Sequence, residues 1–82
     1  MRCAYISFMK DDPGRVEAVA PEHAAYWHGL GLRDYLGPFA DRSGGLISFE
    51  TYSRPAEQLV AHDPFVREGL VERSWIKEWR VE

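Results

Sequence analysis

Two spacings of apolar residues alternate along this chain, and their order limits its fold more than any other feature. Apolar residues at every second position predict strands, whereas spacings of three and four residues predict helices. Clusters of Gly, Pro, Asp and Ser separate the segments. The segments follow one another as strand, helix, strand, strand, helix and strand, over these predicted ranges: Arg2–Met9, Arg15–Leu30, Leu32–Leu36, Leu46–Tyr52, Pro55–Ala61 and Leu70–Val81.

This order predicts an α+β domain with the ferredoxin-like βαββαβ arrangement and an antiparallel sheet. The loop over residues 37–45 is too short for a crossover helix, so the second and third strands should form a hairpin with Gly44-Gly45 as its turn. Both helices then cover one face of the sheet and leave the other face bare. Aromatic side chains on that bare face would make it a dimer surface.

The first helix contains a proline that affects its expected length. Pro21 lacks an amide hydrogen and fits best in a first helical turn, so we expect a short turn before it and the main helix after it. His23, Trp27 and Leu30 then share one face of that helix, which points to the interior. In a first turn the helix dipole would disfavour a charged His23 ring, while a nearby carboxylate would favour it.

Length and charge limit the classes of protein to which the chain can belong. With 82 residues it should form one small domain, which buries only about 60% of the surface of the unfolded chain and is marginal alone, so we expect a homodimer. A net charge of −3 with scattered Lys and Arg argues against nucleic acid as a partner. The chain has no long apolar run, and its single cysteine, Cys3, should be a buried packing thiol. We therefore expect a cytoplasmic protein with no membrane partner.

His23 and Asp63 are the candidate catalytic pair. An imidazole changes its charge near neutral pH, and a carboxylate bound to one ring nitrogen fixes which nitrogen faces a substrate. Such a pair can abstract a proton beside a carbonyl, or assist elimination, without a cofactor. In the alternative interpretation, Asp63 only caps a backbone turn before Pro64, and His23 is a packing residue. His28 lies five residues after His23, so the two do not form an i, i+4 metal pair, and we expect no metal.

Other residues are candidates for contact with a small-molecule ligand. Gly37, Pro38 and Phe39 could form the wall of a cleft, although a simple turn explains them equally well. Tyr5 and Ser7 could contribute hydroxyl groups to the same cleft. Trp75 could stack on a planar ligand, although core or dimer packing is the commoner role of a strand aromatic.

The chain resembles the YCII-related proteins along essentially its whole length. The resemblance depends on the order of several short motifs: Pro21-Glu22-His23, Gly37-Pro38-Phe39, the glycine-containing hairpin, Asp63-Pro64-Phe65 and Lys77-Glu78-Trp79-Arg80. It implies a single YCII-like domain over residues 1–82 that pairs through its sheet into a dimeric α+β barrel, with a His-Asp dyad at His23 and Asp63. Members often have Arg three residues before the His, where this chain has Ala20, and Arg15 is a possible substitute.

These observations lead to one main hypothesis of function and two alternatives. The YCII-related proteins, which the chain resembles, have as a relative a dehydrochlorinase that removes HCl from a chlorinated hydroxyquinol-type ring. The resemblance therefore implies that the dyad can serve elimination chemistry. The main hypothesis is a cofactor-independent lyase or isomerase, with His23 as general acid or base and Asp63 as its orienting partner. The first alternative is a non-catalytic module for ligand binding or dimeric assembly. The second, a cofactor-free monooxygenase, follows only from the shared barrel architecture.

Overall fold

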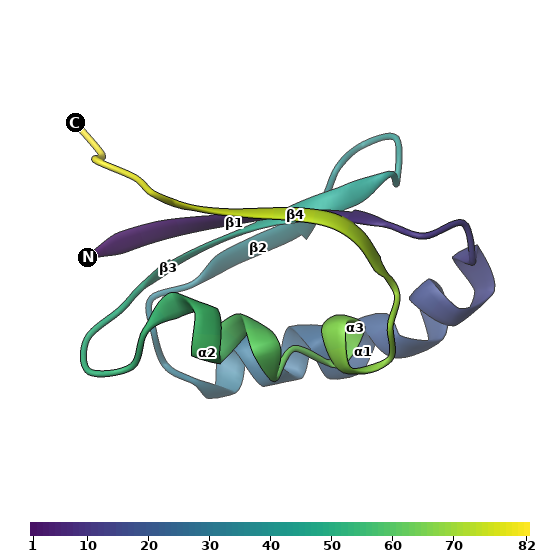
Figure 1. Ribbon diagram of the computed structural model, residues 1–82, viewed down its shortest axis with the longest axis horizontal. Coiled ribbons are helices and arrows are strands. Elements are labelled where there is room, and N and C mark those ends of the chain that lie inside the picture. The colour runs from purple at the N-terminus through teal and green to yellow at the C-terminus, as the bar shows by residue number, and fades with distance from the viewer.

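A four-stranded antiparallel sheet forms one layer of the protein, and three helices form the other (Figure 1). The computed structural model describes residues 1–82. The strands are ordered β2-β3-β1-β4 in the sheet, which confirms the predicted ferredoxin-like arrangement, with one additional helix. In chain order the elements are β1 (Arg2–Met9), α1 (Pro13–Gly29), β2 (Tyr35–Pro38), β3 (Gly44–Glu50), α2 (Ala56–Ala61), α3 (Pro64–Arg67) and β4 (Val71–Glu78).

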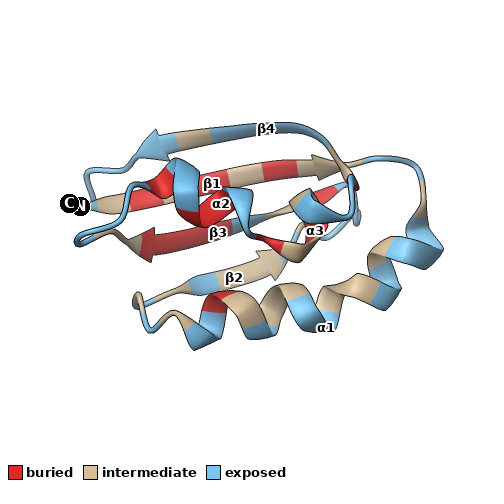
Figure 2. Cartoon of the chain, turned by 60° about the horizontal axis from the view of Figure 1, so that its bottom comes forward, coloured by how far each residue is buried: buried red, intermediate tan, exposed pale blue.

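The core lies between the helices and the face of the sheet that they cover (Figure 2). On this face, Cys3 and Tyr5 of β1 lie opposite Phe49 and Ile47 of β3. Trp27 of α1 is completely buried and packs on Phe49, with the ring centroids 4.8 Å apart. Burial of one large apolar side chain stabilises a fold by about 1.5–3 kcal/mol, so Trp27 is a main attachment of α1 to the sheet.

The opposite face of the sheet carries no helix (Figure 1). The predicted alternation of β1 directs Ala4, Ile6 and Phe8 to this open face, where Ile6 lies beside Trp75 of β4. Several large apolar side chains of the open face and its margins are exposed: Tyr35, Leu46, Trp75 and Trp79. The sheet therefore presents an apolar surface away from its own core.

Helix α1 is continuous through Pro21, so the predicted interruption is wrong. The helix begins earlier than expected because Asp12 caps it, accepting from the amide of Arg15 at 3.4 Å, and because Pro13 occupies the first turn. An internal proline costs roughly 3 kcal/mol, and the packing of Trp27 farther along the same helix offsets this cost. His23 consequently lies in the middle of α1 and not in a first turn.

The hairpin of β2 and β3 begins and ends at different residues from those predicted. Gly37 and Pro38, expected in the loop, belong to β2, whereas Gly44 and Gly45, expected in the turn, begin β3. Gly44 approaches β1 so closely that a Cβ atom there would lie 1.9 Å from the backbone oxygen of Ser7. The glycine is therefore needed for strand pairing and not for a turn.

A short helix, α3, follows α2 at a place where the sequence predicted only a break. Asp63 caps α3 by accepting from the amide of Phe65 at 2.9 Å, and Pro64 occupies the first position of the helix. This helix brings Asp63 and Phe65 against α1. None of the helices has the length and apolar character needed to cross a membrane.

Candidate active site

Two side chains that are 40 residues apart in the sequence meet beneath the sheet. His23 projects from the middle of α1, and Asp63 precedes α3. The Nδ1 atom of His23 lies 2.8 Å from Oδ1 of Asp63 and 3.0 Å from its Oδ2. Asp63 is only 1% exposed, so the contact is shielded from solvent. The structure thus brings His23 and Asp63, hereafter the dyad, into direct contact.

Three separate N–H groups hold the carboxylate of Asp63. Besides His23, it accepts from the indole Nε1 of Trp27 at 3.0 Å and from the amide of Phe65 at 2.9 Å. The capping role considered as the alternative for Asp63 is therefore present together with the contact to His23. A carboxylate bound by several fixed donors has one orientation, and it orients the imidazole in turn.

This arrangement determines which nitrogen of His23 is free. An ionised carboxylate only accepts hydrogen bonds, so Nδ1 carries the proton and Nε2 of the neutral ring keeps its lone pair. Nε2 has no hydrogen-bond partner and is not one of the buried unpartnered atoms, so it contacts solvent. The ring of Phe65 stacks on the imidazole, with the centroids 4.3 Å apart. The expected influence of the helix dipole on His23 is wrong, because the dipole acts within the terminal turns.

Tyr5 and Ser7 lie on the same face of the sheet as the dyad. Tyr5 is 1% exposed, and its ring centroid is 6.3 Å from that of Trp27. Burial, followed by the negative charge of Asp63, raises the pKa of Tyr5 to about 12, so its hydroxyl is protonated at neutral pH. Ser7 is also buried, one residue beyond Ile6 on β1. Both residues therefore face the helices that carry the dyad.

Two residues of this region were not among the candidates. Trp27 was assigned only to the buried face, but its indole also orients Asp63, and its i, i+4 spacing from His23 was the available signal. Ser74 lies directly opposite Ser7 in the pairing of β1 with β4. No sequence motif marks Ser74, because its place depends on the register of two strands far apart in the chain.

The other predicted ligand contacts lie on the open face, away from the dyad. Gly37, Pro38 and Phe39 line a hollow of about 540 Å³ there. Phe39 lies 5.6 Å from Phe8, and Phe8 meets Trp75 edge-on at 6.0 Å between ring centroids. The expected single cleft is therefore divided between two faces, because alternate residues of a strand point to opposite sides.

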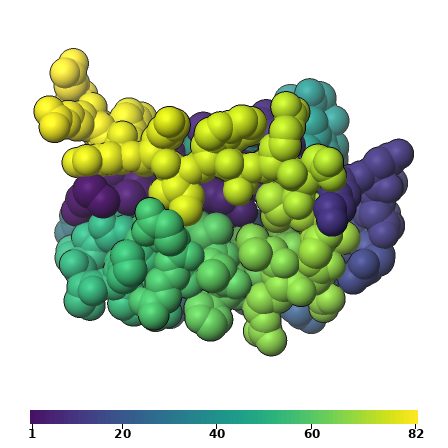
Figure 3. Space-filling view, viewed as in Figure 1, coloured from purple at the N-terminus to yellow at the C-terminus, as the bar shows by residue number.

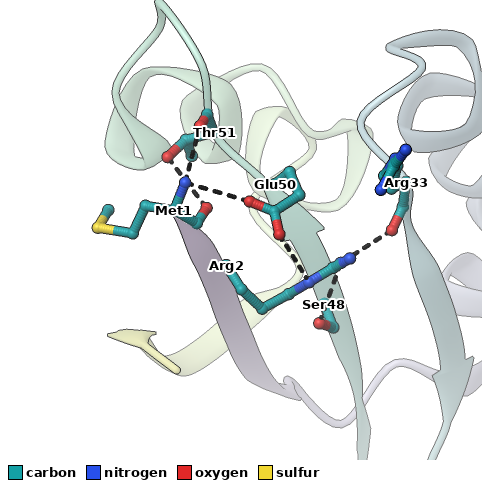
Figure 4. A network of polar contacts seen from close by, with 6 residues as sticks. All are labelled: Met1, Arg2, Arg33, Ser48, Glu50 and Thr51. Atoms are coloured by element: carbon teal, nitrogen blue, oxygen red, sulfur yellow. Dashed lines mark hydrogen bonds and ion pairs between the residues drawn. The ribbon is translucent and has the colours of Figure 1, made fainter. Parts of the chain in front are cut away.

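Arg2 also borders this hollow and connects three segments around it (Figure 4). Its guanidinium donates to the backbone oxygen of Arg33 at 2.8 Å and to Oγ of Ser48 at 3.4 Å, and it pairs with Glu50 at 3.4 Å. Arg33 has φ of 54°, an uncommon conformation for a residue other than glycine. The hydrogen bond from Arg2 helps to hold the loop before β2 in this conformation.

The dyad borders neither this hollow nor a second one of about 160 Å³. Six residues line the second hollow: Leu30, Leu32, Tyr52, Ser53, Arg54 and Leu59. Arg15, the suggested substitute for the arginine missing at Ala20, instead pairs with Glu68 at the surface, at 3.4 Å. No group of three or more His, Cys, Asp or Glu residues could hold a metal ion. A neutral imidazole whose Nδ1 is bound to a carboxylate can accept a proton at Nε2.

Among solved structures, the chain is similar to the 5-chloro-2-hydroxyhydroquinone dehydrochlorinase (TftG) from Burkholderia phenoliruptrix AC1100, in complex with 2,5-dihydroxybenzoquinone. The match covers 98% of this chain and 94% of that chain, with a TM-score of 0.83 and 19% sequence identity. At this identity the likeness shows a shared fold. No protein-family model and no curated protein matches the sequence.

Proposed function

We propose that this protein is a cofactor-independent enzyme of the lyase or isomerase type, acting on a small oxygenated compound with an aromatic ring or a carbonyl group. The observation that carries the proposal is the arrangement of His23, whose Nδ1 is bound by a buried carboxylate while Nε2 is free. Asp63 is the positioning residue, and His23 is the general base or acid.

The proposed reaction begins with transfer of a proton to Nε2 of His23. The proton leaves a carbon or hydroxyl group conjugated with a carbonyl, and the released electron pair moves onto the carbonyl oxygen. The resulting imidazolium is stabilised by the carboxylate of Asp63 at 2.8 Å. In an isomerase the imidazolium returns the proton to a second atom of the substrate. In a lyase the electron pair instead expels a leaving group such as chloride, and HCl is lost overall.

The similarity to TftG supports this class of substrate. That protein is named a dehydrochlorinase and was solved with a dihydroxybenzoquinone, and it shares the fold over 98% of the present chain. The order of the Pro-x-His, Gly-Pro-Phe and Asp-Pro-Phe motifs further supports assignment of residues 1–82 to the YCII-related proteins as a single domain. The free, buried thiol of Cys3 supports a cytoplasmic location.

The open face of the sheet supports a homodimer. Its exposed Trp75 and Leu46, together with the 540 Å³ hollow beside residues 37–39, form a surface that a second copy could cover. We assign Gly37, Pro38, Phe39 and Trp75 to this face, where they would line the space between two subunits. Light scattering after gel filtration should give the mass of a dimer, and a stable monomer would contradict the assignment.

The catalytic proposal is tested by a turnover assay with matched histidine variants. Chlorinated hydroxyquinols and small hydroxylated quinones are incubated with the protein, and chloride release and ring absorbance are followed. His23→Gln should lower the rate by about 10²- to 10⁴-fold, which is the usual contribution of a general base. His28→Gln is the control, because His28 forms a similar contact with Asp34 but is exposed. Equal rates for native protein and His23→Gln would reject His23 as the base.

A second candidate function is ligand binding or assembly without catalysis. It is favoured by the position of the larger hollow, which lies on the open face and not beside the dyad. In that case the protein would bind hydroxylated rings without converting them. The Phe39→Ala variant would then weaken binding, whereas His23→Gln would leave it unchanged.

A further inference from the structure

Three hydroxyl groups lie together on the covered face of the sheet, those of Tyr5, Ser7 and Ser74. Tyr5 and Ser7 are separated by one residue on β1, and Ser74 lies opposite Ser7 on β4. The Oη atom of Tyr5 is buried and unpartnered. Ser7 and Ser74 are the hydroxyl neighbours of Tyr5, and their hydrogen-bonding capacity acts to lower its pKa against the effect of burial.

An unpartnered buried hydroxyl is unusual in a folded protein. Buried polar atoms are nearly always bonded, because an unmade hydrogen bond is unfavourable. The only other such atom in this protein is Oδ2 of Asp34, which lies beside Nδ1 of His28 and so has a polar neighbour in contact. Tyr5 therefore differs from the other buried polar side-chain atoms of the protein, and the difference suggests a partner that binds from outside.

The three hydroxyls run from the protein interior to the surface at one edge of the sheet. Ser7 is buried, whereas Ser74 is exposed on the edge strand β4. Figure 3 shows atoms of β1, in purple, between the yellow-green β4 and the green helices. The ring of Tyr5 lies 6.3 Å from that of Trp27, whose indole donates to Asp63, so Tyr5 and the dyad belong to one region. A small molecule that binds beside Ser74 would therefore approach this region from the β4 edge of the sheet.

We propose that Tyr5, Ser7 and Ser74 form a subsite that binds a carbonyl or phenolic oxygen of the substrate. This proposal rests on the proposed function, and it names the part of the substrate that the protein recognises. When Nε2 of His23 removes a proton, the electron pair moves onto that oxygen, which becomes an enolate or phenolate. The hydroxyl of Tyr5 donates a hydrogen bond to this oxygen and keeps its own proton, which stabilises the charge as it forms.

The protonated state of Tyr5 fits this role. Burial and Asp63 raise its pKa to about 12, so the phenol remains a donor throughout the neutral range. The new negative charge forms near Asp63, but it forms together with the imidazolium of His23, so the total charge of the region does not change. The substrate should therefore be a ring or carbonyl compound whose reacting atom is conjugated with the bound oxygen.

The test compares Tyr5→Phe and Ser74→Ala with the native protein, using 2,5-dihydroxybenzoquinone as the binding probe. Calorimetry gives the Kd, thermal melting gives the Tm, and the turnover assay gives kcat and KM. Each variant should raise the Kd about tenfold, the change expected from about 1.4 kcal/mol of binding free energy. Tyr5→Phe should also lower kcat and leave the Tm unchanged or higher, because it removes a buried hydroxyl without a partner. Tyr52→Phe is the control, since Tyr52 is 70% exposed and borders only the smaller hollow.

The outcomes separate the subsite from the proposed function. Native affinity and kcat in both Tyr5→Phe and Ser74→Ala, with a large loss in His23→Gln, would overturn the subsite and leave the proposed function standing. A lower Tm for Tyr5→Phe without a change in Kd would also overturn it, because the hydroxyl would then have only a structural role. Weakened probe binding with no turnover by the native protein would support the subsite and reject the catalytic proposal. A native protein that neither binds nor converts any compound of the panel would reject both.

Discussion

Replacing Asp63 by asparagine should destabilise the protein and disable His23 together. The change preserves the shape of the side chain but turns one carboxylate oxygen into an amide NH₂ group. One oxygen of Asp63 accepts from the amide of Phe65 at 2.9 Å, and the other accepts from the indole of Trp27 at 3.0 Å. Whichever way the asparagine amide is turned, its NH₂ group faces one of these buried N–H groups.

The magnitude follows from that conflict. A buried donor left without an acceptor costs about 1–3 kcal/mol. The remaining hydrogen bonds also weaken, because their acceptor is no longer a charged carboxylate. We expect a total of about 3 kcal/mol, which is a large part of the 5–15 kcal/mol typical of a small domain. For a domain of this size each kcal/mol lowers the Tm by roughly 4–8 °C.

The same change alters the tautomer of His23. When the asparagine NH₂ group faces Nδ1 it donates to that nitrogen, so the ring proton moves to Nε2 and the lone pair needed for proton abstraction is lost. Turnover should fall by about 10²- to 10⁴-fold, as expected when the partner of a catalytic histidine stabilises the wrong tautomer.

Urea unfolding followed by tryptophan fluorescence measures the stability change. The matched control is Asp34→Asn, because Asp34 contacts Nδ1 of His28, whose side chain is 62% exposed. The Asp34 side chain is only 8% exposed, but its one side-chain partner is the exposed ring of His28, so the control should cost less than Asp63→Asn. If Asp63→Asn is no more destabilising than Asp34→Asn, the explanation based on three buried donors is wrong.

Three further predictions concern the core. Cys3 is 1% exposed, and burial raises the pKa of its thiol. The thiol should therefore react with a disulfide reagent only after unfolding. Rapid modification of the native protein would contradict its burial. Burial raises the pKa of Tyr5 from 10.0 to about 12, so below pH 10 the folded and unfolded chains are both protonated at this group. Between pH 10 and 12 only the unfolded chain loses the proton, so the free energy of unfolding should fall by about 3 kcal/mol, and pH-dependent urea unfolding of Tyr5→Phe should lack this component. Gly44→Ala places a Cβ atom 1.9 Å from the Ser7 backbone oxygen and should lower the free energy of unfolding by about 3 kcal/mol or more. Gly29→Ala is the control, because its Cβ atom meets no atom within 4 Å and the change should be nearly neutral. Equal melting temperatures for the two variants would contradict the close approach of β3 to β1.

The fold was predictable because its strongest signals are local. The alternation in Arg2–Met9 gave both limits of β1 correctly, and Gly29 and Gly31 correctly marked the end of α1. The errors occurred where a tertiary contact determines the local structure. Pro21 is tolerated inside α1 because the same helix is attached by Trp27, and Gly44 is a strand residue because β1 leaves no room for a side chain.

The candidate site was predictable only in part. The order of segments and the family resemblance were sufficient to place His23 beside Asp63, since they fix which helices share a face. The separation of Trp75 from the dyad and the position of Ser74 beside Ser7 depend on strand register, which two distant segments determine jointly. No single stretch of sequence contains that information.

The central claim is that Asp63 fixes His23 with its proton on Nδ1 and leaves Nε2 free. Ring-nitrogen NMR of protein labelled with ¹⁵N-histidine measures this directly at a pH where the ring is neutral, and His23→Gln identifies the signal. We predict the Nδ1–H tautomer for His23, although free histidine in water favours Nε2–H. A His23 signal with the proton on Nε2 would contradict the proposed arrangement.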